Sequence, residues 1–249
     1  MKGEVALFIP CLVDQFLPEI GMAVVKVLSR LGVNFRYDQR QTCCGQPLIN
    51  GGYIEGAKKV AKHFISIFEG SDYVVAPSGS CIHTVKDHYP TLFEDEPDWH
   101  ARAVELSGKV FEFTQFLVSV LGVKDVGARF NARACLHEAC AVLRGLGIKD
   151  APKVLLEEVG GLELVPMNDS DVCCGFGGEF SVDFPMISEA IVKDKAENFK
   201  NSGADVLVLA EPGCLLNIRG YMTRNRIPGQ VRHIAEILAQ CPGIGGMQK

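Results

Sequence analysis

Short apolar runs alternate with longer amphipathic segments from the start of the chain. The first run, residues 5–9, ends at Pro10 and predicts a buried strand. Apolar residues then recur every three or four positions between Pro18 and Leu31, and Gly32 follows them, which predicts an amphipathic helix with a glycine C-cap. Further strands are expected at 34–37, 73–77 and 109–113, and helices at 53–69 and 114–121.

The same order returns after a stretch of small, weakly patterned residues at 122–128. Strands are expected at 129–136, 162–166 and 205–210, helices at 150–159 and 185–202, and the segment 231–238 parallels 110–118. Alternating strands and helices indicate a parallel sheet in each half. We therefore predict an α/β fold of two duplicated Rossmann-like halves, divided into domains 1–127 and 128–249.

Cysteines follow the predicted strands of both halves in one pattern. In the first half, 31 residues (12–42) precede a Cys-Cys-Gly motif, and 36 residues (45–80) separate its cysteine pair from the last cysteine. The corresponding numbers in the second half are 32 (141–172) and 39 (175–213). Since the carboxyl ends of parallel strands meet at one edge of a sheet, each half is expected to gather four thiols there. The two sets are Cys11, Cys43, Cys44 and Cys81, and Cys140, Cys173, Cys174 and Cys214.

Composition and charge narrow the classes of function. The chain has 249 residues, 47% hydrophobic composition and a net charge of −5 without a basic block, which argues against a nucleic-acid partner. The first apolar run is too short for a signal peptide or a membrane span, so a cytoplasmic protein is expected. Because cytosolic thiols stay reduced, the ten cysteines indicate metal binding or redox chemistry.

Four converging thiolates suit an iron–sulfur cluster or a soft metal ion. Adjacent cysteines cannot easily bind one small ion together, whereas a cluster offers them separate iron atoms. A structural zinc site in the second set is the alternative from a different class of function. Packing as small buried hydrophobes does not explain two matched sets, but it is the expectation for Cys135 and Cys241, which have no counterparts in the other half.

The motifs that surround these cysteines resemble those of the cysteine-rich CCG-domain family, over nearly the full length of the chain. This family includes the heterodisulfide reductase B subunit, the glycolate oxidase iron–sulfur subunit and proteins of lactate utilization, and the resemblance is greatest to the last group. The motifs that carry it are Phe8-Ile-Pro-Cys-Leu-Val-Asp14, Gln41-Thr-Cys-Cys-Gly-Gln-Pro47, Ala76-Pro-Ser-Gly-Ser-Cys81 and Cys173-Cys-Gly-Phe-Gly-Gly178.

The resemblance implies an oxidoreductase subunit that acts with other iron–sulfur subunits to oxidise L-lactate to pyruvate. It places the family's cluster ligands on the eight matched cysteines and implies two [4Fe–4S] clusters. In the heterodisulfide reductase subunit the last ligand element is Cys-x-x-Cys, but Ser78 and Glu211 stand at its first position here. This departure weakens a third hypothesis, thiol–disulfide redox chemistry.

Histidines near the cysteines are the remaining candidates. His83 and His137 lie close enough in sequence to Cys81 and Cys140 to ligate a metal or carry a proton, but surface or helix-capping roles are the favoured interpretation. The sequence contains no recognisable Ser-His-Asp arrangement, paired-carboxylate motif or flavin fingerprint. It therefore identifies no catalytic residue for removing hydride from lactate.

Overall fold

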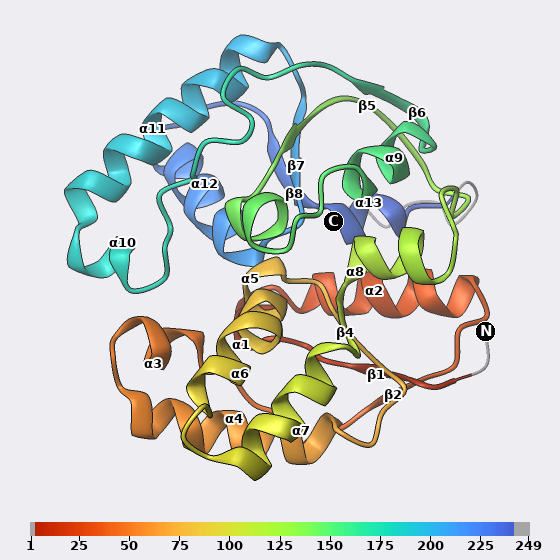
Figure 1. The fold of residues 1–249 in the computed structure, drawn as a ribbon. Coiled ribbons are helices and arrows are strands. Elements are labelled where there is room, and N and C mark those ends of the chain that lie inside the picture. The colour runs from red at the N-terminus through yellow and green to blue at the C-terminus, as the bar shows by residue number, and fades with distance from the viewer. Residues whose placement is uncertain (1–2, 242–249) are drawn as a thin grey trace.

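Two four-stranded parallel sheets form the framework of the protein (Figure 1). The computed structural model describes residues 3–241. The strand order is β2-β1-β3-β4 in the first sheet and β6-β5-β7-β8 in the second, which is the same order twice. The strands are β1 (Val5–Leu7), β2 (Phe35–Tyr37), β3 (Tyr73–Ala76), β4 (Val110–Glu112), β5 (Arg129–His137), β6 (Gly160–Leu164), β7 (Val206–Leu209) and β8 (Gln230–His233). The predicted α/β fold with two similar halves is confirmed.

Helices connect the strands and cover both faces of each sheet. Those of the first half are α1 (Cys11–Phe16), α2 (Pro18–Arg30), α3 (Gln46–Asn50), α4 (Ile54–Phe68), α5 (Gly79–His83), α6 (Tyr89–Leu92), α7 (Pro97–Ser107) and α8 (Phe113–Gln115), with π-helical turns η1 (Thr84–His88) and η2 (Phe116–Val120). The second half has η3 (Ala141–Gly145), α9 (Ala151–Glu157), α10 (Phe180–Asp183), α11 (Pro185–Ser202), α12 (Pro212–Arg224) and α13 (Ile234–Leu238). None of the helices between residues 3 and 241 combines the length and apolar character needed to cross a bilayer.

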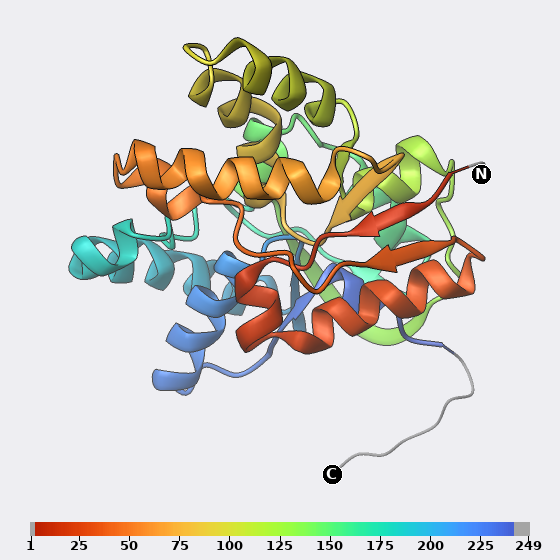
Figure 2. The same ribbon diagram turned by 90° about the horizontal axis from the view of Figure 1, so that it is seen from below.

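The first sheet packs differently on its two faces, because successive side chains of a strand point to opposite sides. Figure 2 shows α4 and α2 on opposite sides of this sheet. Ala6 and Phe8 pack towards α4 in a core of the first half alone, whereas Val5 and Leu7 pack towards α2. The core on the α2 side of the sheet, which contains Val5 and Leu7, continues into the second half through α13 and β7. The halves therefore share one apolar core, and the boundary at 127/128 stays a prediction.

Helix boundaries follow from the local sequence. The apolar face of α2 is buried, Pro18 occupies its first turn, and Gly32 follows it with φ +66°, a conformation that glycine adopts without steric cost. Gly203 ends α11 in the same way. Several segments expected as loops or left unassigned are helical: Cys11 begins α1, Cys81 lies in α5, residues 97–107 form α7, and Cys214 lies in α12.

Candidate metal centres

Each cysteine pair lies on a turn whose shape depends on the glycine that follows it. Gly45 has φ +81° and Gly175 has φ +83°, in the left-handed region. Each glycine N–H donates to the sulfur of the first cysteine of its pair, Cys43 or Cys173, at 3.3 Å. A Cβ on Gly175 would lie 2.7 Å from the backbone oxygen of Ser188, closer than atoms can pack. The two pairs thus have the same local structure.

The first set of cysteines converges at the carboxyl ends of the strands β1, β2 and β3. Cys11 follows β1 and its sulfur lies 3.7 Å from that of Cys43. Cys44 is within hydrogen-bonding reach of both Cys43 and Cys81. Cys11 is exposed, Cys43 half-buried, and Cys44 and Cys81 buried. All four predicted thiols of the first half therefore meet at one edge of the sheet, with the outer end open to solvent.

The second set repeats this arrangement. Cys140 and Cys173 are half-buried and lie close enough to shift each other's pKa, while Cys174 and Cys214 are buried, with their sulfurs 2.8 Å apart. Cys214 lies in the first turn of α12, as Cys81 does in α5. The prediction that four thiols gather in each half agrees with this geometry.

Hydrogen bonds between the thiols concentrate negative charge on one sulfur of each set. The pKa of Cys43 falls to about 3, chiefly because Cys11 donates to it and then because Cys44 does. The pKa of Cys173 falls to about 2 because of hydrogen bonds from Cys140 and Cys174. The same bonds, together with burial, raise the pKa values of Cys11 and Cys140. Such thiol clusters are suited to a cation that replaces the shared protons.

The unmatched cysteines lie apart from these sets. Cys135 is fully buried on β5, and its sulfur lies 3.7 Å from that of Met167 and 3.8 Å from the Ser202 hydroxyl. Burial raises its pKa to about 11, which keeps the thiol neutral. The predicted packing role of Cys135 is confirmed. Cys241 is half-buried, at the end of the described chain.

His137 is the site residue that the sequence analysis undervalued. The expectation of a surface or capping role is wrong, because its side chain is 1% exposed at the end of β5. One ring nitrogen of His137 and the sulfurs of Cys174 and Cys214 all lie within 4.8 Å of one another. The pKa of Cys214 falls to about 6, mainly through the hydrogen bond from Cys174 at 2.8 Å. His83, by contrast, is partly exposed beside Asp87 at 3.3 Å.

Ser78 and Glu211, which replace the extra cysteines expected from the relatives, meet between the two halves. The Ser78 hydroxyl donates to Glu211 Oε1 at 3.3 Å, and Ser80 donates its backbone N–H to Oε2 at 2.8 Å and its hydroxyl to Oε1 at 3.0 Å. Burial raises the pKa of Glu211 to about 7. One carboxylate thus connects the N-termini of α5 and α12, the helices that carry Cys81 and Cys214. No sequence spacing relates Ser80 to Glu211.

Known proteins resemble this chain over most of its length. The profile of the CCG family, described as a cysteine-rich domain, matches residues 5–86 and 134–219, which include all eight matched cysteines. Lactate utilization protein A of Geobacillus kaustophilus (strain HTA426) is 49% identical over 235 residues, covering 94% of this chain and 98% of that protein. Lactate utilization protein A 1 of Bacillus mycoides (strain KBAB4) is 46% identical over 244 residues, covering 98% and 100%.

A solved structure shares the fold at low sequence identity. The crystal structure of a hypothetical protein from Helicobacter pylori matches 99% of this chain and 50% of its own, with a TM-score of 0.58 and 10% identity. It supports the α/β architecture and carries no information on function. The family assignment depends on the profile, which covers more than half of the chain, and on the relatives, which match it almost end to end. The chain therefore belongs to the CCG cysteine-rich domain family, among relatives named lactate utilization protein A.

Proposed function

We propose that this protein is the iron–sulfur electron-transfer subunit of a cytoplasmic complex that oxidises L-lactate to pyruvate. The observation that carries the proposal is the convergence of two equivalent sets of four sulfurs at the sheet edges. Its relatives' name supplies the metabolic context of lactate utilization. One set would bind its cluster through Cys11, Cys43, Cys44 and Cys81, and the other through Cys140, Cys173, Cys174 and Cys214.

The donor set fits such a group in each half. The outer thiol is accessible for assembly, the inner two are buried, and the Gly45 and Gly175 N–H groups already donate to sulfur. A bound cluster would accept and release single electrons. Oxidation of lactate releases two electrons and two protons, and the proposed role of this chain is to pass on the electrons. Removal of hydrogen from the substrate is assigned to partner subunits of the same system.

Anaerobic reconstitution tests this function. Protein loaded with ferrous iron and sulfide should show sulfur-to-iron charge-transfer absorption and, after reduction, EPR signals from two centres. Cys43→Ser/Cys44→Ser should remove one signal and Cys173→Ser/Cys174→Ser the other. Cys135→Ser is the matched control, because Cys135 is a buried cysteine outside both sets, and it should retain both. Absence of acid-labile sulfide from all preparations would refute the proposal.

A structural zinc site in the second half is the second candidate. The grouping of His137 with Cys174 and Cys214 favours it, because mixed nitrogen and sulfur ligands suit tetrahedral zinc. Zinc retained at about one per chain, without sulfide, would support a scaffold over an electron carrier. Heterodisulfide-type redox chemistry is disfavoured, since the positions of its extra cysteines are occupied by a serine and a glutamate that hydrogen-bond to each other.

A further inference from the structure

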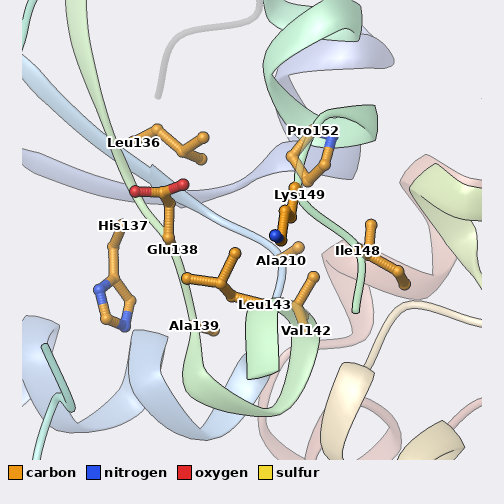
Figure 3. Close-up of a pocket in the computed structure, with 10 residues that line it drawn as sticks. All are labelled: Leu136, His137, Glu138, Ala139, Val142, Leu143, Ile148, Lys149, Pro152 and Ala210. Carbon is orange, nitrogen blue, oxygen red and sulfur yellow. The ribbon is translucent and has the colours of Figure 1, made fainter. Parts of the chain in front are cut away.

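One buried ring nitrogen beside the second set of thiols has no partner. His137 Nδ1 lies 3.0 Å from the backbone oxygen of Ser170, whereas Nε2 is buried without a hydrogen bond. A buried polar atom without a partner is costly and needs an explanation. His137 lines a small pocket together with Ile148 and Pro152, and in Figure 3 its imidazole points away from these two residues.

The hydrogen bond to Ser170 determines the chemical character of Nε2. A carbonyl oxygen only accepts hydrogen bonds, so Nδ1 carries the proton and donates it. In a neutral imidazole with this tautomer the free lone pair is on Nε2, and one ring nitrogen of His137 lies within 4.8 Å of the sulfurs of Cys174 and Cys214. A histidine whose second nitrogen is held by a carbonyl is the usual arrangement of a metal ligand. The imidazole is therefore oriented for ligation before any metal binds.

Within residues 3–127, the part of the first half that the structure describes, no nitrogen donor stands at the equivalent position. His137 precedes Cys140 by three residues, and the residue three positions before Cys11 is Phe8. Phe8 is fully buried, with its ring centroid 4.8 Å from that of Phe64 and 5.8 Å from that of Phe68. The duplicated halves thus offer four sulfur donors in the first set and four sulfurs plus one nitrogen in the second.

We propose that His137 Nε2 is a ligand of the centre held by the second set of thiols, which makes this centre easier to reduce than the all-sulfur centre of the first set. The inference rests on the proposed function in assuming iron–sulfur centres. Because each iron of a [4Fe–4S] cluster takes one protein ligand, Nε2 would occupy the place of one of the four thiolates of the second set. A neutral imidazole donates less negative charge to iron than a thiolate does, so this replacement of sulfur by nitrogen raises the reduction potential. Electrons would then flow from the first centre to the second.

Pulsed EPR on the full chain tests this assignment. In Cys43→Ser/Cys44→Ser protein, reconstituted anaerobically with ferrous iron and sulfide and then reduced, the remaining signal should show the strong ¹⁴N coupling of an imidazole ligand. Adding His137→Phe, the residue found at the equivalent position 8, should abolish the coupling and shift the reduction midpoint to lower potential. His83→Phe, a histidine beside the first set, is the control and should change neither.

The outcomes separate the two proposals. A centre that forms but lacks the nitrogen coupling, or keeps it in the His137→Phe protein, overturns the assignment and leaves the iron–sulfur function intact. If no centre forms at all, the proposed function fails, and cobalt(II) added alone then tests the ligand. Its visible bands should shift between wild-type protein and His137→Phe, and identical spectra would overturn the assignment. The wild-type measurements do not depend on how well the variant folds.

Discussion

The buried carboxylate of Glu211 joins the two halves, and its removal gives the most quantitative test of the structure. Glu211 accepts hydrogen bonds from the backbone N–H and the hydroxyl of Ser80, and from the backbone N–H of Gly213 as the N-cap of α12. Glu211→Ala removes all of them and leaves buried donors unsatisfied. Ser80→Ala removes the hydroxyl bond alone, because the backbone N–H remains.

The expected magnitudes follow from these contacts. Loss of an N-cap costs about 1 kcal/mol, and each hydrogen bond to a charged group contributes about 1.5–3 kcal/mol. Glu211→Ala also removes the free-energy cost of burying a carboxylate, and this gain offsets part of the loss from the N-cap and the hydrogen bonds. We expect Glu211→Ala to lower the free energy of unfolding by about 3 kcal/mol and Ser80→Ala, which loses one such bond, to lower it by about 1.5 kcal/mol. In the double variant the effects should fall short of additivity by about 1 kcal/mol, because the same bond is lost in both.

Urea unfolding of the metal-free, reduced protein, followed by circular dichroism, measures these values. Glu19→Ala is the control: Glu19 also pairs across the halves, with Arg219 at 3.9 Å, but both side chains are largely exposed. Such a pair contributes at most about 1 kcal/mol, so this variant should remain close to wild type. Strict additivity of Ser80→Ala and Glu211→Ala would show that the two residues do not interact in solution and would refute the reasoning.

Three further predictions concern other parts of the structure. Burial raises the pKa of Glu112 from 4.5 to about 7. Between these two pH values the native state binds a proton that the unfolded state has lost, so the free energy of unfolding falls as pH rises through this range. Glu112→Gln should remove up to about 3 kcal/mol of this pH dependence, measured by urea titrations at several pH values. Gly175→Ala should cost about 1–3 kcal/mol and lower the iron content of the second centre alone, because its Cβ meets the Ser188 carbonyl. Gly79→Ala should lower the free energy of unfolding by a similar amount, because the added Cβ clashes with the Val142 side chain of the other half. Adding Val142→Ala to this variant should restore the urea midpoint.

The fold and the thiol sets were predictable because they depend on local patterns. Apolar runs that end at glycine or proline mark the strands, and parallel strands necessarily bring the residues after them to one edge. Nearly equal spacing in both halves then identified Cys11 and Cys140 as counterparts. Helix α7 was left unassigned because it has few buried residues and its apolar face is short. Its polar sequence gives a weak periodic signal, and packing against the rest of the first half stabilises it.

Contacts between the halves could not be predicted in this way. Ser80 and Glu211 are 131 positions apart, and their hydrogen bonds depend on how one sheet is placed against the other. The burial of His137 could not be predicted either, since its position at the end of a strand is compatible with either solvent or core. One signal was nevertheless present. A histidine stands where the duplicated half has Phe8, and such a departure from a repeat indicates a position with its own role.

The departures from the repeat explain how two centres with the same thiols can differ. In the first half the carbonyl of Cys44 accepts a hydrogen bond from the Tyr89 hydroxyl at 2.8 Å, within an aromatic cluster. In the second half the carbonyl of Cys174 accepts from the Asn217 amide at 2.9 Å, and His137 adds a nitrogen donor. Reduction potential depends on hydrogen bonding, burial and ligand type around a centre. Under the proposed function, duplication would supply two electron sites, and the changed surroundings would supply the difference in potential that gives electron flow between them a direction.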